Sequence, residues 1–181
     1  MSTYFTIGHA TRPIGEFIKL LQEANVQLVV DVRTIPRSRT NPQYNREQLP
    51  VTLAKSEIAY RHLSALGGLR RKSRGIAPEI NGFWRHDSFH NFADYAMSPA
   101  FGAGLAELRE LGDACRCAIL CAETLWWRCH RRIIADYLMA TGDTVFHILG
   151  PGHIERATLT PAARLLPDRT LAFPAPARST G

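Results

Sequence analysis

Short apolar segments alternate with amphipathic segments along most of the chain. Five segments have the composition of short strands, at residues 4–7, 26–32, 59–63, 117–121 and 144–149. Apolar positions recur at helical spacing in residues 13–24, 49–55, 89–97, 101–111 and 128–139. Strands that alternate with helices build a sheet covered on both faces. We therefore predict an α/β fold: a single three-layer domain, with a mainly parallel sheet of about five strands and helices on both faces.

Three segments interrupt this alternation. Residues 34–44 contain Pro36 and Pro42, which exclude a regular element, and residues 67–83 form a long loop rich in glycine and basic residues. Residues 161–181 contain four prolines. We expect the α/β domain to span residues 1–160, and a proline-rich tail that wraps the surface or frays to span residues 161–181.

Composition narrows the class of protein. The 181 residues are 45% hydrophobic and 21% charged, which is typical of a globular domain. No apolar run approaches the ~18 residues of a membrane span, and the first ten residues lack the pattern of a secretory signal. The four cysteines are simplest to explain as reduced thiols. We expect a cytoplasmic protein that does not bind membranes.

Basic residues are concentrated in one part of the chain. Residues 31–74 hold ten basic and three acidic residues, a net charge of +7, whereas the rest of the chain carries −1. Arginine outnumbers lysine by 19 to 3, and the guanidinium group binds phosphate bidentately. A codon bias towards arginine explains this ratio equally well, but it does not explain the clustering. The partner we expect is a nucleotide or a nucleic acid.

Ligands of parallel sheets bind outside the carboxyl ends of the strands, so we look for polar side chains there. The candidates at these ends, or at the start of the following helix, are Gly8, His9, Asp31, Arg33, Cys121, Glu123, Cys129, His130 and Arg131. The loop after the second strand adds Arg37 and Arg39. Cations at a helix start oppose the helix dipole, so a bound anion would account for Arg128 and Arg131.

These residue types indicate roles in a reaction on a phosphate-bearing substrate. Four arginines would hold the phosphate: Arg33, Arg37, Arg39 and Arg131. Glu123 or Asp31 would act as general base, and His9 would carry a proton. The alternative for Asp31 is a structural ion pair with Arg33 or Arg131. On its helical stripe Arg131 points towards the sheet, where a carboxylate is the partner we favour.

The cysteines support a weaker set of hypotheses. Their spacing does not match a zinc ribbon or finger, so we expect no metal, although Cys121, Cys129 and His130 form a possible ligand set. Cys121 is more often a packing residue than a nucleophile. Sulfur or redox chemistry would need a thiolate of low pKa, which the neighbouring arginines and the helix start could provide.

Five further side chains have other interpretations. We expect His147 to be a satisfied core histidine, and Arg132 and Asp136 to form a solvated ion pair on the helix surface. Trp126 and Trp127 would either stack on an aromatic ligand or cover an apolar surface or dimer contact.

The ordered set of motifs resembles a bacterial and archaeal family catalogued as domain of unknown function 488. The resemblance covers roughly residues 4–149. It is carried by residues 6–9 (TIGH), 31–33 (DVR), 36–39 (PRSR), 66–68 (LGG), 121–123 (CAE) and 129–131 (CHR). It implies a compact α/β domain and a cytoplasmic protein, without a substrate. Residues 125–127 (LWW) depart from the polar residues and proline frequent there in the family.

Two classes of function therefore remain beside the thiol hypothesis. The first is an enzyme acting on a nucleotide or nucleic acid, with an arginine clamp and a carboxylate base, that hydrolyses a phosphoester or an N-glycosidic bond. The second is a nucleic-acid-binding module without catalysis. Acidic groups at the strand ends argue against simple binding, because they repel phosphate. The sequence assigns no cofactor.

Overall fold

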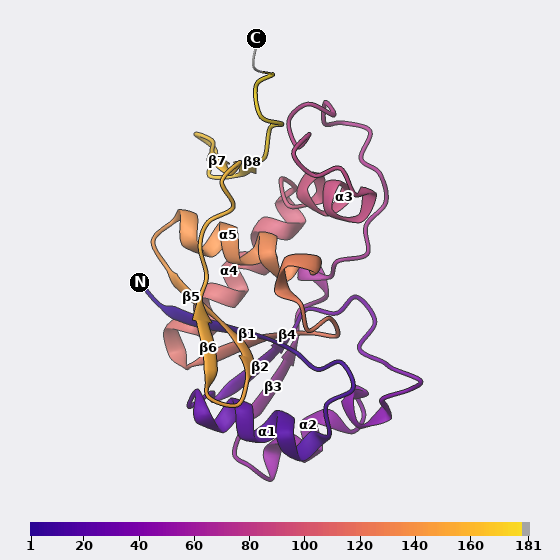
Figure 1. Cartoon of the computed structure of the whole chain (residues 1–181), viewed down its shortest axis with the longest axis vertical. Coiled ribbons are helices and arrows are strands. Elements are labelled where there is room, and N and C mark those ends of the chain that lie inside the picture. Colours follow the sequence, from indigo (N-terminus) through magenta and orange to yellow (C-terminus); the bar gives the residue numbers. More distant parts are fainter. Residues whose placement is uncertain (179–181) are drawn as a thin grey trace.

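A six-stranded sheet runs through the centre of the molecule (Figure 1). The computed structural model describes residues 1–178. The strand order is β3-β2-β4-β1-β5-β6, in which the first five strands along the chain are parallel and β6 is antiparallel to β5. The strands are β1 (Thr3–Gly8), β2 (Leu28–Asp31), β3 (Ala59–His62), β4 (Cys117–Cys121), β5 (Thr144–Gly150) and β6 (His153–Arg156).

Five α-helices cover the two faces of this sheet. They are α1 (Ile14–Glu23), α2 (Leu49–Ala54), α3 (Asp87–Tyr95), α4 (Pro99–Ala114) and α5 (Arg131–Ala140). Figure 1 shows α1 and α2 below the sheet and α3, α4 and α5 above it. Short 3-10 turns lie at η1 (Pro42–Tyr44), η2 (Ser64–Leu66) and η3 (Trp126–Arg128). The predicted three-layer α/β domain is confirmed.

Alternating side chains of the central strands divide the core into two layers. Phe5 and Ile7 of β1 pack with the apolar side chains of α1 and α2, whereas Tyr4 packs with those of α4 and α5. Ala118 and Ile119 of β4 divide between the two layers in the same way. Both faces of the strands are therefore buried, which is why their sequences read as short apolar runs.

The strand order places a crevice at the carboxyl edge of the sheet. Neighbouring strands β1 and β4 are parallel, with Gly8 paired to Cys121 at their ends. The chain leaves β1 towards α1 on one face and leaves β4 towards α5 on the other (Figure 1). When the segments after two neighbouring strands run to opposite faces of the sheet, a crevice forms between them. α/β proteins bind their ligands in such a crevice.

The pattern of apolar positions predicted the five parallel strands and the five α-helices, but not the exposed strand β6. All five predicted strands and five predicted helices are present, with ends displaced by a few residues. The largest difference is α5, which begins at Arg131, because Trp126–Arg128 forms a separate 3-10 turn. The missed strand β6 is exposed along its whole length, so its residues carry no apolar pattern.

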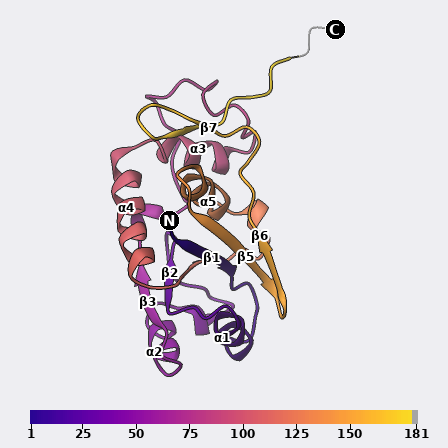
Figure 2. The ribbon, with the colours of Figure 1, turned by 90° about the vertical axis from the view of Figure 1, so that its left-hand side faces the viewer.

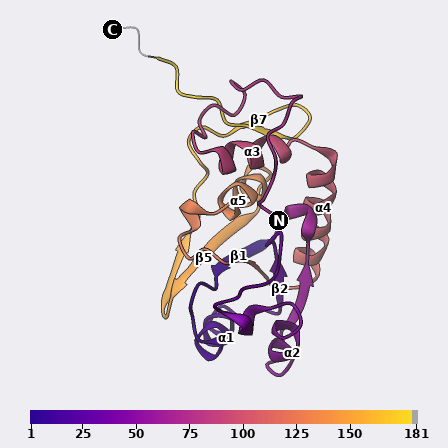
Figure 3. The ribbon, with the colours of Figure 1, turned by 90° about the vertical axis from the view of Figure 1, so that its right-hand side faces the viewer.

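The C-terminal segment is part of the core up to Phe173. Its two short strands, β7 (Arg164–Leu165) and β8 (Leu171–Ala172), form a hairpin that lies beside α3 in Figures 2 and 3. Phe173 is fully buried, and its ring meets that of Trp84 edge to face, 5.3 Å between centroids. The backbone N–H of Phe173 donates a hydrogen bond to the carbonyl of Ile80, and its carbonyl accepts one from the N–H of Phe83. The tail therefore wraps the domain through this residue, rather than fraying.

None of the helices in residues 1–178 combines the length and the apolar character needed to cross a bilayer.

We predict that Phe173→Ala lowers the free energy of unfolding by about 3–5 kcal/mol, because it leaves a cavity beneath the hairpin. Leu165→Ala, in the same hairpin but 52% exposed, is the matched control and should change stability by less than about 0.5 kcal/mol. Urea titration of both variants measures the difference. Equal, small effects would show that the tail does not contribute to the core.

Candidate functional site

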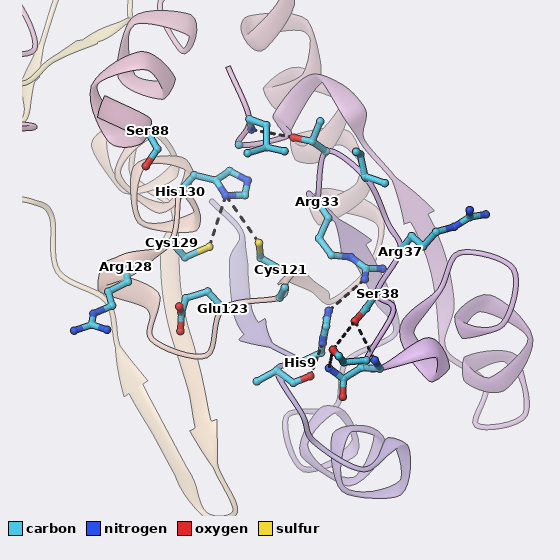
Figure 4. A pocket seen from close by; sticks show the side chains of 18 of the residues that line it. His9, Arg33, Arg37, Ser38, Ser88, Cys121, Glu123, Arg128, Cys129 and His130 are labelled. Atoms are coloured by element: carbon cyan, nitrogen blue, oxygen red, sulfur yellow. Dashed lines mark hydrogen bonds between the residues drawn. The ribbon is translucent and has the colours of Figure 1, made fainter. Parts of the chain in front are cut away.

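A cavity of about 570 Å³ opens at the carboxyl edge of the sheet (Figure 4). Its walls come from the segments that follow β1, β2, β3 and β4 and from the start of α3. The candidate residues that line it are His9, Arg33, Arg37, Cys121, Glu123, Cys129 and His130. Gly8, Asp31, Arg39 and Arg131 do not belong to its described lining, although Gly8, Asp31 and Arg131 lie directly behind it.

Asp31 and Arg33 form a buried ion pair behind one wall of the cavity. The guanidinium donates from Nε to Oδ1 (2.9 Å) and from Nη2 to Oδ2 (2.7 Å) of Asp31. The Tyr60 hydroxyl donates to the same Oδ2 (2.5 Å). Asp31 is fully buried and Arg33 is 5% exposed. Because its oxygens are occupied by these donors, Asp31 matches the alternative interpretation, a structural partner of Arg33, and not the base.

His9 is held by the same network. Its Nδ1 lies 2.9 Å from the carbonyl oxygen of Ala10, so Nδ1 carries the proton, and Nε2 accepts from Nη1 of Arg33 (3.2 Å). The ring stacks on Tyr44 at 4.2 Å. Burial lowers the pKa of His9, and the charge of Arg33 lowers it further. Both ring nitrogens are occupied, so the structure gives His9 a positioning role towards Arg33.

Cys121, Cys129 and His130 meet on the opposite wall (Figure 4). Their two Sγ atoms and the Nδ1 atom all lie within 4.8 Å of one another. Nδ1 of His130 is 3.6 Å from Sγ of Cys129 and 4.0 Å from Sγ of Cys121. We call these three residues the Cys–His cluster. They are the only group of three or more His, Cys, Asp and Glu side chains within residues 1–178 that could hold a metal ion.

The orientation of His130 is fixed from behind. Its Nε2 lies 3.0 Å from the carbonyl oxygens of both Val32 and Leu66, so Nε2 carries a proton and donates it. In the neutral ring Nδ1 then has a free lone pair, which faces the two sulfurs. Gly68 makes room for the ring, because a Cβ at this position would lie 2.6 Å from Nδ1.

The two thiols of the cluster differ in acidity. Burial raises the pKa of Cys129, but the thiol of Cys121, the charge of Arg131 and the Arg131 backbone amide outweigh this and lower it to about 6. The bond to Cys129, together with burial, raises the pKa of Cys121 to about 12. Cys121 therefore holds its proton more tightly than Cys129 does.

Arg131 is buried, as its helical stripe predicted, but the predicted carboxylate partner is wrong. Its Nη2 donates to the backbone carbonyl of Glu123 (2.6 Å), and its Nε has no partner within the described residues. The Glu123 carboxylate instead accepts from the backbone N–H of Leu125 (2.9 Å). Gly8 lies against this turn, because a Cβ there would overlap the carbonyl oxygen of Glu123. The glycine serves backbone packing.

Two exposed arginines stand at the rim. Arg37, which is 67% exposed, pairs with the equally exposed Glu47 at 3.2 Å, an ion pair that water screens strongly. Arg128 is exposed on the facing side, at the end of η3 (Figure 4). Arg39 is exposed outside the lining. Two exposed arginines thus belong to the cavity lining, and Arg128, not Arg131, is the arginine that the segment between β4 and α5 contributes to it.

Trp126 and Trp127 of η3 contact each other, and Trp126 also packs on the buried His147. Trp126 stacks on His147 with 4.4 Å between centroids, and Thr6 bonds Nδ1 of His147 (2.7 Å). The core role of His147 is confirmed. Trp127 is 46% exposed outside the cavity lining.

The predicted surface ion pair of α5 is wrong. Asp136 is fully buried and accepts from the N–H of Thr160 (2.8 Å), because residues after β6 cover this face of the helix. Arg132 lies over the ring of Trp84, 5.0 Å from its centroid. Sequence analysis also missed Tyr44 and Tyr60, since neither the stacking on His9 nor the bond across the sheet to Asp31 follows a local pattern.

We predict that Asp31→Asn lowers the free energy of unfolding by about 3–5 kcal/mol, because it leaves a buried guanidinium without its counter-charge. Tyr60→Phe removes only one hydrogen bond to that carboxylate and should cost about 1.5–3 kcal/mol. Urea titrations of both variants give the order. A larger loss for Tyr60→Phe would contradict the central place of the ion pair.

Burial, together with the charge of Arg131, lowers the pKa of His147 to about 4. The unfolded chain binds a proton near pH 6.5 and the folded chain does not, so stability is complete above this pH and declines as the pH falls towards 4. His147→Gln should remove up to about 3 kcal/mol of this acid sensitivity. Unfolding titrations of both proteins between about pH 7 and pH 4 measure it. Parallel pH profiles would contradict the assignment.

The comparisons with known proteins agree with the motifs at the strand ends. No curated protein and no solved structure matches the chain. The family model described as "Domain of unknown function DUF488" matches residues 13–138, which include Asp31, Arg33 and the whole Cys–His cluster. The chain therefore belongs to the DUF488 family.

Proposed function

We propose that the protein is an enzyme that binds a phosphate-bearing substrate, a nucleotide or nucleic acid, in the cavity at the carboxyl edge and transforms it at the Cys–His cluster. The observation that carries the proposal is the meeting of two sulfurs and an imidazole nitrogen at the cavity wall, within 4.8 Å of one another. Sulfur and imidazole are the most reactive side-chain groups near neutral pH.

The neighbouring acids support the choice of the cluster over a carboxylate base. Asp31 is occupied by Arg33 and Tyr60, and it lies behind the lining. Glu123 reaches the cavity, but one of its oxygens bonds the N–H of Leu125. A group that acts at this wall, by taking a proton or by holding a metal ion, needs a free lone pair. His130 offers one at Nδ1, because its Nε2 donates to the carbonyl oxygens of Val32 and Leu66.

The rim supports an anionic substrate. Arg37 and Arg128 belong to the cavity lining on opposite sides, and both are exposed. Figure 4 shows their side chains reaching outwards from the rim. The ion pair of Arg37 with Glu47 is exposed on both sides, so exchanging this partner for a phosphate costs little. The net charge of +7 over residues 31–74, a segment that includes the loop after β2, also favours a polyanion. A cytoplasmic location completes the proposal, because all four cysteines are free thiols.

We expect Arg37→Ala and Arg128→Ala each to weaken binding of nucleotides or oligonucleotides by about 10- to 100-fold, since a charge-assisted hydrogen bond is worth about 1.5–3 kcal/mol. Arg156→Ala is the matched control, because this exposed arginine of β6 lies outside the cavity lining. Binding is measured with nucleotides and with single- and double-stranded oligonucleotides at several salt concentrations. Affinity should fall as salt rises. Unchanged binding in both rim variants would refute the phosphate-bearing substrate.

A further inference from the structure

We propose that Cys121, Cys129 and His130 hold a thiophilic divalent cation, with Zn²⁺ as the natural candidate, and that its open coordination position faces the cavity. This cation is the group beside which the substrate of the proposed function would bind. The metal site itself does not depend on that function; only the identity of the substrate does. Sequence spacing argued against a metal site, since two of the ligands are adjacent and the third precedes Cys129 by eight residues. The β4–α5 turn brings all three together.

The distances within the cluster are close to those of a tetrahedral site. With Zn–S of about 2.3 Å and Zn–N of about 2.05 Å, tetrahedral angles place sulfur about 3.6 Å from nitrogen and the two sulfurs about 3.8 Å apart. Nδ1 of His130 lies 3.6 Å from one sulfur and 4.0 Å from the other, and the sulfur pair is within 4.8 Å. A shift of up to about 1 Å in the Cys121 side chain would bring its sulfur to the tetrahedral distances.

The imidazole is prepared as a metal ligand. A ligating histidine typically donates its other N–H to a carbonyl or carboxylate, which fixes the tautomer and the direction of the ring. Nε2 of His130 donates to the carbonyl oxygens of Val32 and Leu66, both at 3.0 Å. The edge-to-face contact with Phe92, 4.9 Å between centroids, holds the ring from the side. Its Nδ1 therefore points at the sulfurs without further rearrangement.

The charges at the cluster also favour a cation. Two ligating thiolates bring a charge of −2 to a site where Cys129 is 4% exposed, and buried charges need compensation. The guanidinium of Arg131 supplies one positive charge nearby, but its bond goes to the Glu123 carbonyl. A divalent ion neutralises both thiolates. Binding would release two protons, one from each thiol, so that charge and atoms balance.

Three protein ligands leave the fourth tetrahedral position to a water or a substrate atom, as in catalytic zinc sites. All three ligands belong to the cavity lining, so this position is accessible from the cavity. An ion placed there polarises a substrate oxygen or acidifies a bound water. That chemistry suits hydrolysis of a phosphate-bearing substrate.

The test is a titration of the whole chain, reduced and stripped with a chelator, with Co²⁺ as the spectroscopic probe and Zn²⁺ as competitor. We expect one equivalent of Co²⁺ to produce thiolate-to-cobalt charge-transfer bands and tetrahedral d–d bands, which Zn²⁺ abolishes. Cys121→Ser and Cys129→Ser should each lose the charge-transfer intensity of one sulfur and weaken binding at least tenfold. Cys115→Ser is the matched control and should bind Co²⁺ like the unaltered protein, because Cys115 bonds a backbone carbonyl away from the cavity.

A second pair of variants leaves every ligand in place. Gly68→Ala puts a methyl group 2.6 Å from Nδ1 of His130 and should weaken Co²⁺ binding by at least about tenfold. Gly75→Ala, in the same loop with nothing within 4 Å of its added carbon, should bind normally. This pair keeps the test decisive if a serine variant does not fold.

Three results would overturn the metal site: no charge-transfer band, full affinity in both serine variants, or a disulfide between Cys121 and Cys129 in the protein as isolated. If the protein does not bind Co²⁺ but Arg37→Ala still weakens oligonucleotide binding, the metal site is refuted and the proposed function stands. If the protein binds Co²⁺ normally but binds no phosphate-bearing ligand, the proposed function is refuted and the metal site stands.

Discussion

The buried ion pair between Asp31 and Arg33 is the interaction on which the site depends most. It sits where β2 ends, and the same guanidinium reaches Nε2 of His9 after β1 and the carbonyl of Tyr44 in η1. One charged group thus joins three segments that are distant in sequence. A buried guanidinium is tolerated only when its donors are satisfied, so these partners fix one wall of the cavity.

The opposite wall depends on a different constraint, the close approach of β1 to the turn after β4. Gly8 has no side chain, so the turn at Glu123 can pass directly over the end of β1, and Arg131 holds it there through the Glu123 carbonyl. This turn determines where η3 and α5 begin, and therefore where Cys129 and His130 lie relative to Cys121. Residues that look catalytic in sequence, Asp31 and Arg131 above all, build the walls. The groups that line the cavity include sulfur, imidazole, the Glu123 carboxylate and two exposed arginines.

The fold and the position of the site could be predicted from sequence because both follow local patterns. The bounds of strand β4 agree with the prediction, since its apolar run begins after Arg116 and ends shortly before Glu123. The stripe with Ile134 and Leu138 correctly predicted that Arg131 is buried. The hydrogen-bond partners of the site residues could not be predicted, because they depend on the strand order. Tyr60 reaches Asp31 only because β3 is the neighbour of β2, and His130 meets the carbonyls of Val32 and Leu66 only across the crevice. The exposed strand β6 left no apolar pattern to detect.

The reactive centre that we propose for this protein is the Cys–His cluster with a bound cation. The most direct test is a crystal structure of protein supplied with Zn²⁺, with diffraction recorded on both sides of the zinc absorption edge. We predict an anomalous peak about 2.3 Å from each sulfur of the cluster and about 2.0–2.1 Å from Nδ1 of His130. A structure without a peak there, or with Cys121 and Cys129 joined as a disulfide, would contradict the claim.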